Sequence, residues 1–178
     1  MMARPRILVM TGNKLRHKFY ASQILTRYPD SIVLFEKQPP SPWGCHVKRS
    51  DPSDVVRRHF EEFAKTEEAM FAPTVFEQQE FLQERTFLTI DEGRINDVAI
   101  IERVADLNPD LIASLGTSII REKFIQRFPL RIVNFHAGLS PYYRGSGTNV
   151  FPFFNNELQY VGITLHYIDA GIDSGPII

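Results

Sequence analysis

Four short apolar runs, each set between segments of helical pattern, constrain the fold of this chain more than any other feature. The runs span residues 6–10, 31–35, 111–115 and 132–135. Apolar runs of this length without polar alternation are typical of strands buried on both faces of a sheet. Strands that alternate with helices usually pair in parallel through right-handed crossovers. The sequence therefore predicts an α/β fold of Rossmann-like type, a mostly parallel sheet with helices on both faces.

The remaining segments carry helical and strand patterns of their own. Asn96 stands where the cap of one helix is expected, and three prolines predict a loop over residues 38–44. We expect helices over residues 15–28, 54–71, 77–85, 97–107, 117–128 and 147–155. We expect further strands over residues 87–90, over 161–168 and from 176 onward.

The composition is that of one soluble globular domain, which we expect to span residues 1–178. Hydrophobic residues make up 43% and charged residues 23% of the chain. The net charge of −1 indicates no basic face, which argues against a nucleic-acid partner. No apolar run is long enough to span a membrane, and Cys45 is alone, so we expect a cytoplasmic protein without disulfides. A core strand begins at Pro176, so we expect the domain to continue past Ile178.

Three polar side chains lie at predicted strand ends near the end of the chain. Asn134 and His136 close the run 132–135, and Asp173 lies in a glycine-rich turn after the strand over 161–168. An amide, an imidazole and a carboxylate are the groups needed for base-assisted attack on a carbonyl, with a donor for the oxyanion. The sequence therefore predicts a catalytic site built from these three residues.

Each of the three residues also has a structural interpretation. Asn134 could cap a loop, Asp173 could satisfy the amides of its own turn, and a lone histidine at a strand end is usually structural. Their occurrence together favours catalysis. His136 could be a general base or could stabilise the tetrahedral intermediate, and its protonation state decides between the two. We expect His17 on a solvated helix face, although its place near the end of the first strand could let it contact an anionic ligand. The sequence names no partner for His166.

These residues resemble the folate-dependent formyltransferases. Members of that family have Asn-x-His, then Leu-x-Pro-x-x-Arg/Lys-Gly, then Asp-x-Gly-x-Asp-x-Gly. The matching residues are Asn134 and His136, Leu139–Pro141 with Arg144 and Gly145, and Asp169–Gly175. The resemblance rests on sequence motifs from about residue 110 onward. Before that residue it rests only on the order of strands and helices. It implies 10-formyltetrahydrofolate as the formyl donor and a small-molecule amine as the acceptor. No Cys/His cluster has the spacing of a zinc site, so we expect no metal.

The resemblance also implies residues that bind the donor and the acceptor. The main chain of Ala170, Gly171 and Ile172, together with Leu139, is expected to line the pterin pocket. A family segment that begins 16 positions before the motif asparagine adds Ser118, Ile119 and Ile120, although Ile119 and Ile120 could equally be core residues. Arg144 could bind a phosphate or carboxylate or anchor its loop, and Tyr142 could stack on the acceptor or cover the loop.

Elimination favours one group within that family. Glycinamide ribonucleotide formyltransferases have a Ser-Gly-x-Gly-Ser-Asn loop after the first strand, and Thr11–Lys14 departs from it. The first turn of the methionyl-tRNA enzymes is absent. Formyltetrahydrofolate hydrolases have an extra N-terminal domain, whereas here we expect the first strand to start at Arg6. The sequence of residues 138–145 most resembles that of the N-formyltransferases that act on nucleotide-linked amino sugars for surface polysaccharide. A tRNA or ribonucleotide acceptor, a non-catalytic folate-binding module and a homodimer all stay open.

Overall fold

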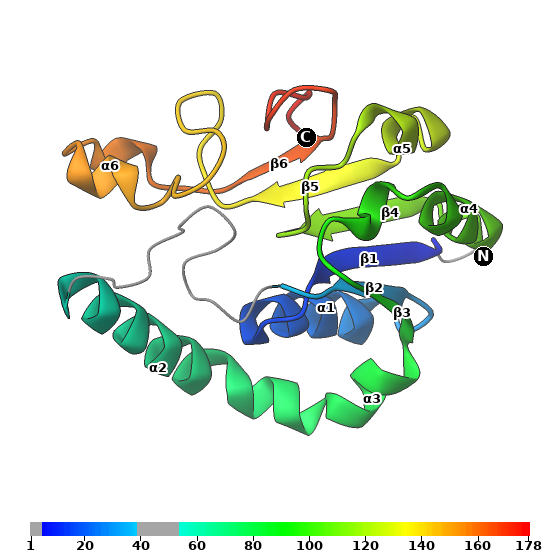
Figure 1. The fold of residues 1–178 in the computed structure, drawn as a ribbon, viewed down its shortest axis with the longest axis horizontal. Helices are drawn as coiled ribbons and strands as arrows, with labels where there is room; N and C mark the ends of the chain where they lie inside the picture. Colours follow the sequence, from blue (N-terminus) through cyan, green and yellow to red (C-terminus); the bar gives the residue numbers. More distant parts are fainter. Residues whose placement is uncertain (1–4, 39–53) are drawn as a thin grey trace.

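The computed structural model describes residues 5–38 and 54–178, and the predicted loop over 38–44 lies outside them except for Gln38. Six strands form one sheet in the order β3-β2-β1-β4-β5-β6 (Figure 1). Strands β1 to β5 are parallel, and β6 is antiparallel to β5. The strands are β1 Ile7–Gly12, β2 Ile32–Glu36, β3 Thr86–Ile90, β4 Leu111–Leu115, β5 Ile132–His136 and β6 Thr164–Tyr167. The mostly parallel α/β fold predicted from the apolar runs is confirmed.

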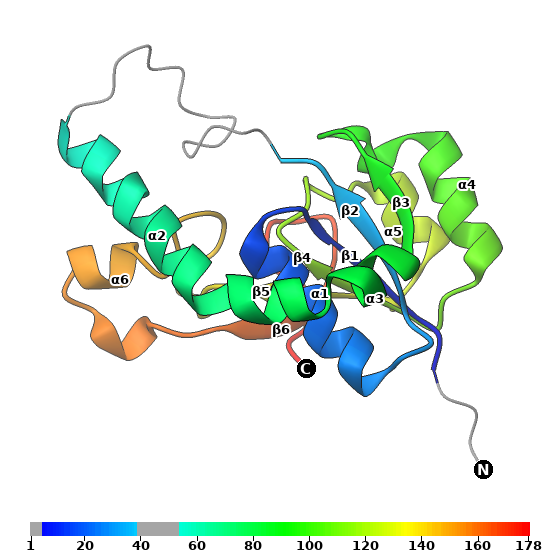
Figure 2. The same cartoon turned by 90° about the horizontal axis from the view of Figure 1, so that it is seen from below.

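Helices cover both faces of this sheet. Figure 2 shows α1, α2 and α3 in front of the sheet, with α2 extending past its edge, and α4 beyond it. The helices are α1 Leu15–Arg27, α2 Asp54–Glu77, α3 Gln79–Glu84, α4 Val98–Leu107, α5 Glu122–Arg127 and α6 Phe151–Phe154, with 3₁₀ turns η1 Arg94–Asn96 and η2 Leu158–Tyr160. None of the described helices is both long and apolar enough to cross a membrane.

Each face of the sheet has its own apolar core because strand side chains alternate between the two faces. On β1, Leu8 and Met10 pack in the cluster that includes residues of α4 and α5. Ile7 and Val9 point the other way and pack with residues of α1, α2 and α3. All four side chains are buried, so β1 is the centre of the fold.

Helix α2 and helix α5 differ from the prediction, and packing explains both. Helix α2 continues past residue 71, through Pro73, to Glu77 because Ala72 and Val75 are buried, with Val75 in the core cluster that includes residues of α1 and the sheet. This burial outweighs the hydrogen bond that a proline removes from a helix. Helix α5 begins at Glu122 rather than at residue 117 or 118, because side chains from distant elements bind the backbone just before it.

Three smaller predictions were also wrong at their edges. Asn96 is not the cap of α4, because the cap position is Asp97 and the Asn96 side chain bonds to the main chain of Ile119 and Arg121. Helix α6 is a single turn, and β6 is shorter than 161–168. The strand predicted from residue 176 onward pairs with β6 through a bridge between His166 and Ile177.

Candidate active site

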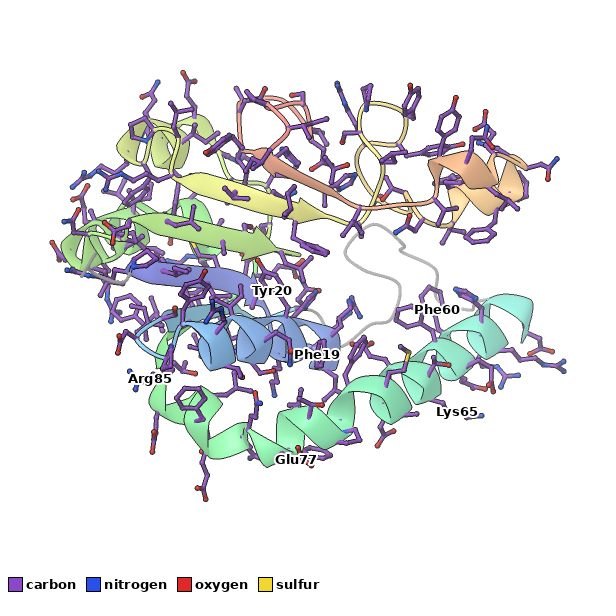
Figure 3. The ribbon with its side chains drawn as sticks, turned by 180° about the vertical axis from the view of Figure 1, so that it is seen from behind. Phe19, Tyr20, Phe60, Lys65, Glu77 and Arg85 are labelled. Atoms are coloured by element: carbon purple, nitrogen blue, oxygen red, sulfur yellow. The ribbon has the colours of Figure 1, made fainter. Side chains whose placement is uncertain are left out.

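The pairing of β5 with β6 puts the polar side chains of the candidate site on one face of the sheet. Asn134 lies opposite His166, and His136 lies opposite Thr164. Directly opposed residues of an antiparallel pair point to the same face. Phe135, between Asn134 and His136, therefore points to the other face, where its ring lies 5.8 Å from the ring of Tyr20. Tyr20 lies on α1 (Figure 3).

Asp173, in the turn after β6, contacts side chains of both β5 and β6. The turn after β6 folds back over β5 and β6 (red in Figure 1) and carries Asp173 at a positive φ of 46°. One carboxylate oxygen, Oδ1, accepts a hydrogen bond from Asn134 Nδ2 at 3.1 Å. The other, Oδ2, accepts from the Gly145 amide at 2.8 Å and lies 3.3 Å from His136 Nδ1. The structure thus brings together the three residues that the sequence predicted as catalytic.

The partners of the two histidines indicate which ring nitrogens carry hydrogen. His136 Nε2 lies 3.0 Å from the carbonyl of Tyr143, and His166 Nδ1 lies 2.8 Å from the carbonyl of Tyr167. A carbonyl only accepts, so each of these nitrogens is the donor. The nitrogen of His136 that faces Asp173 is then the one free to gain or release a proton. His136 is 6% exposed, so its ring is shielded from bulk water.

His166 is a member of the site that the sequence did not reveal. Its Nε2 lies 3.3 Å from Asn134 Nδ2 and 3.4 Å from Asp173 Oδ1, and the side chain is buried. In its neutral form this nitrogen accepts one Asn134 hydrogen while Asp173 accepts the other. Asn134 can therefore donate to a reaction oxyanion only after it releases one of these two partners. Only the pairing register of β5 with β6 reveals that His166 belongs to the site, and the sequence alone did not give that register.

The loop after β5 is anchored by a side chain of β6 and by the main chain of the turn. Thr164 Oγ1 accepts from the Ser140 amide at 2.9 Å and donates to the Gly138 carbonyl at 2.7 Å. Ser140 Oγ donates to the Asp173 carbonyl at 3.3 Å. Leu139, a predicted pterin contact, is half-buried in this loop. These bonds fix the distance between the loop and Asp173.

The two segments expected to bind the folate, residues 118–120 and 170–172, have several main-chain N–H and C=O groups without hydrogen-bond partners among the described residues. Within the described part of the chain, no hydrogen bond reaches the amides of Ile119 and Ile120 or the carbonyls of Ser118 and Ile120. In the turn, the Gly171 amide bonds to Asp169 Oδ1 at 3.0 Å. Ile120 is 6% exposed and belongs to the core, whereas Ile119 is 67% exposed. The core interpretation therefore holds for Ile120 and fails for Ile119.

The two predicted acceptor contacts lie near the site but outside the cluster around Asp173. Tyr142 stacks on Tyr160 with ring centroids 4.2 Å apart, and its side chain is 62% exposed. Arg144 is exposed and has no partner among the described residues. Between them, the hydroxyl of Tyr143 donates to Glu157, and this hydrogen bond raises the pKa of Tyr143.

His17 is buried, which corrects the prediction of a solvated position. Its imidazole packs against Gly12 and Gly116, at the carboxyl ends of β1 and β4, and is 3% exposed. Burial, followed by the charges of Arg16 and Lys14, lowers the pKa of His17 to about 3. Its Nδ1 has no hydrogen-bond partner among the residues that the structure describes. His17 thus fills the crevice between β1 and β4 as a neutral ring, at the point where the strand order reverses.

A family model described as formyl transferase matches residues 52–178, which include the whole candidate site. The chain belongs to the formyl transferase family. Solved formyltransferases share the fold. Glycinamide ribonucleotide transformylase 1 from Symbiobacterium toebii superposes with a TM-score of 0.60 at 20% identity, covering 98% of this chain and 70% of that one.

Relatives within the formyl transferase family differ in acceptor. A methionyl-tRNA formyltransferase from Finegoldia magna is 27% identical over 61% of this chain and 34% of its own length. A phosphoribosylglycinamide formyltransferase from Mycobacterium tuberculosis is 37% identical over 46% of this chain and 38% of its own. The matches thus span well under half of these curated relatives. A third relative, a Mycobacterium tuberculosis protein described as a candidate sugar N-formyltransferase, has a TM-score of 0.52 at 26% identity, covering 98% of this chain and 53% of that one.

Proposed function

We propose that this formyl transferase moves the formyl group of 10-formyltetrahydrofolate to the amine of a nucleotide-linked amino sugar. The observation that carries the proposal is Asp173, whose carboxylate contacts both Asn134 and His136. That arrangement provides a proton acceptor and an amide donor within one buried cluster. Membership of the family supports formyl transfer as the reaction.

The donor fits the two segments that offer unpaired main-chain groups. A pterin ring has amide-like edges, which backbone N–H and C=O groups complement well. Residues 118–120 and 170–172 would hold these edges, and the exposed side chains of Ile119 and Ile172 would cover the ring faces. Bound there, the donor supplies an activated formyl carbon.

The residues of the cluster then divide the work of the transfer. The acceptor amine forms a bond to the formyl carbon while the bond from that carbon to the folate nitrogen breaks. His136 takes the proton that the amine loses, and Asp173 stabilises the imidazolium. Asn134 releases one of its two partners and donates to the formyl oxygen as charge develops there. The proton then passes to the folate nitrogen, so charge and atoms balance.

Two features support an amino-sugar acceptor. The turn after β1 lacks the glycine-rich phosphate loop of the ribonucleotide enzymes, and His17 fills the crevice beside it. Arg144, which has no partner among the described residues, is available for an anionic part of the acceptor, and Tyr142 offers an aromatic face. Because some relatives are methionyl-tRNA formyltransferases, a tRNA is the second candidate acceptor.

A panel of acceptors tests this assignment directly. The protein is incubated with 10-formyltetrahydrofolate and a set of nucleotide-linked amino sugars, and mass spectrometry detects the gain of one formyl group. We expect a gain on an amino sugar and none on glycinamide ribonucleotide. With a net charge of −1, we also expect no salt-sensitive binding of methionyl-tRNA. Formylation of the tRNA, with affinity that falls steeply as salt rises, would overturn the sugar assignment.

Gly138→Ala should lower kcat roughly a hundredfold by displacing the imidazole of His136. A Cβ atom at position 138 would lie 2.5 Å from His136 Nε2 and 2.6 Å from the Cβ of Thr148. Gly162→Ala is the matched control, because a Cβ atom there meets only Leu139, at 3.5 Å. Steady-state kinetics of both variants check the prediction. Full turnover by Gly138→Ala would mean that the position of His136 does not matter for transfer.

A further inference from the structure

Glu36 is a buried carboxylate that the proposed chemistry does not use. It is the last residue of β2 and is 1% exposed. Its Oε1 accepts a hydrogen bond from the Gly93 amide at 2.9 Å, and its Oε2 accepts from the Ser118 amide at 2.6 Å. No ion pair joins it to a lysine, arginine or histidine in residues 5–38 or 54–178. Its charge is therefore compensated by main-chain donors.

Such an arrangement is a costly way to stabilise a fold. Burying a carboxylate without a cation carries a large desolvation cost, which two charge-assisted hydrogen bonds offset only in part. The two bonds instead fix positions: they hold a turn before α4 and the segment after β4 against the end of β2. Both oxygens are needed, one for each amide.

Asn96 holds the same segment from the side of η1. Its Nδ2 donates to the Ile119 carbonyl at 2.9 Å, and its Oδ1 accepts from the Arg121 amide at 2.7 Å. Glu36 and Asn96 together occupy the amides of Ser118 and Arg121 and the carbonyl of Ile119. One amide and one carbonyl without partners among the described residues lie between each of these anchored groups and the next, and all of them precede helix α5. Side chains thus hold residues 118–121 outside helix α5, which begins at Glu122.

We infer that Glu36 is a positioning residue for the formyl donor, acting through the main chain of residues 118–120. This inference rests on the proposed function, in which that segment holds a pterin edge. With Glu36 in place, the unpaired amides of Ile119 and Ile120 have a fixed spacing and direction. Without it, the Ser118 amide has no partner, and the segment can shift toward a longer α5. Preorganised donors bind more tightly because less order is lost on binding.

Glu36→Gln tests the inference, because it keeps the shape of the side chain but leaves one of two amides facing an NH₂ group. The probe is 5-formyltetrahydrofolate, a stable isomer of the donor, and calorimetry measures its Kd. We expect Kd to rise about tenfold, the order of effect of one lost charge-assisted hydrogen bond. Asn96→Ala should also weaken binding, since it removes two bonds to the same segment.

Val104→Ala is the control for general loss of stability. Val104 is fully buried in α4, in the same core cluster as Ile120, but it makes no hydrogen bond to residues 118–121. It should lower Tm at least as much as Glu36→Gln and leave Kd unchanged. An unchanged Kd in Glu36→Gln, or an equal rise in Val104→Ala, would overturn the positioning role.

Amide hydrogen exchange separates this inference from the proposed function. In the protein without folate, we expect the Ser118 amide to exchange much faster in Glu36→Gln than in the parent, while Val104→Ala does not change it selectively. If the parent protein binds no folate, the donor site proposed above fails, and with it the functional role of Glu36. If folate binds but no amine is formylated, the positioning role stands on the Kd comparison alone.

Discussion

Asp173→Asn is expected to lower kcat for formyl transfer on the order of a thousandfold, within the range for general acid–base catalysis, which here needs Asp173 to stabilise protonated His136. In the parent protein the Gly145 amide donates to the Asp173 carboxylate at 2.8 Å, and an asparagine oxygen can still accept this hydrogen bond. Its NH₂ group would then face Asn134 Nδ2, which donates to the carboxylate at 3.1 Å. The charge that stabilises a protonated His136 is also lost. The change therefore removes the chemistry of the cluster with little change in its shape.

Asp169→Asn is the matched control in the same turn. Asp169 also accepts from its own turn, from the Gly171 amide at 3.0 Å and from Ser174 Oγ at 2.7 Å, but it contacts neither histidine. An asparagine at position 169 can keep these bonds through its oxygen, so kcat should fall less than tenfold. Rates and melting temperatures of both variants decide the point. If the two substitutions cost the same activity, Asp173 is a turn residue and not part of the chemistry.

The parts of the site that the sequence predicted are those whose signal is local. Asn134 and His136 end an apolar run, and Asp173 lies in a glycine-rich turn, so residue type and spacing were enough. His166 gives no such signal, because its role depends on the antiparallel register of β6 against β5. That register followed only from the folded sheet, since a shift of one residue would turn His166 to the other face.

The parts of the fold that the sequence missed depend on distant partners. Helix α5 was predicted four or five residues too early because its pattern continues back to residue 117, and the carboxylate that binds the Ser118 amide lies 82 positions away. Similarly, Pro73 marks the end of a helix by local rules, yet α2 continues because Val75 is buried against other elements. In both places tertiary contacts decided the outcome against local preference.

His17 should make the protein markedly less stable in acid. Burial lowers its pKa in the folded protein to about 3, from the ordinary value of 6.5 that the unfolded chain retains. Between these two values the unfolded state binds more protons, so the free energy of unfolding falls as pH falls. The contribution of His17 is complete above pH 6.5 and is lost progressively toward pH 3. At pH 4 the loss is on the order of 3 kcal/mol, from 1.36 kcal/mol per pKa unit.

His17→Leu should remove this part of the pH dependence. Leucine cannot take up a proton, and the substitution breaks no side-chain hydrogen bond to any described residue. Urea unfolding at several pH values between 4 and 7 measures the difference between the parent and the variant. Carboxylates titrate in both proteins and so cancel in that difference. His59→Gln is the control, because His59 lies exposed on α2 and should leave the pH profile of the parent unchanged. A His17→Leu profile parallel to that of the parent would show that His17 is protonated in the folded protein, and that the crevice between β1 and β4 admits enough water or counter-charge to hold an imidazolium.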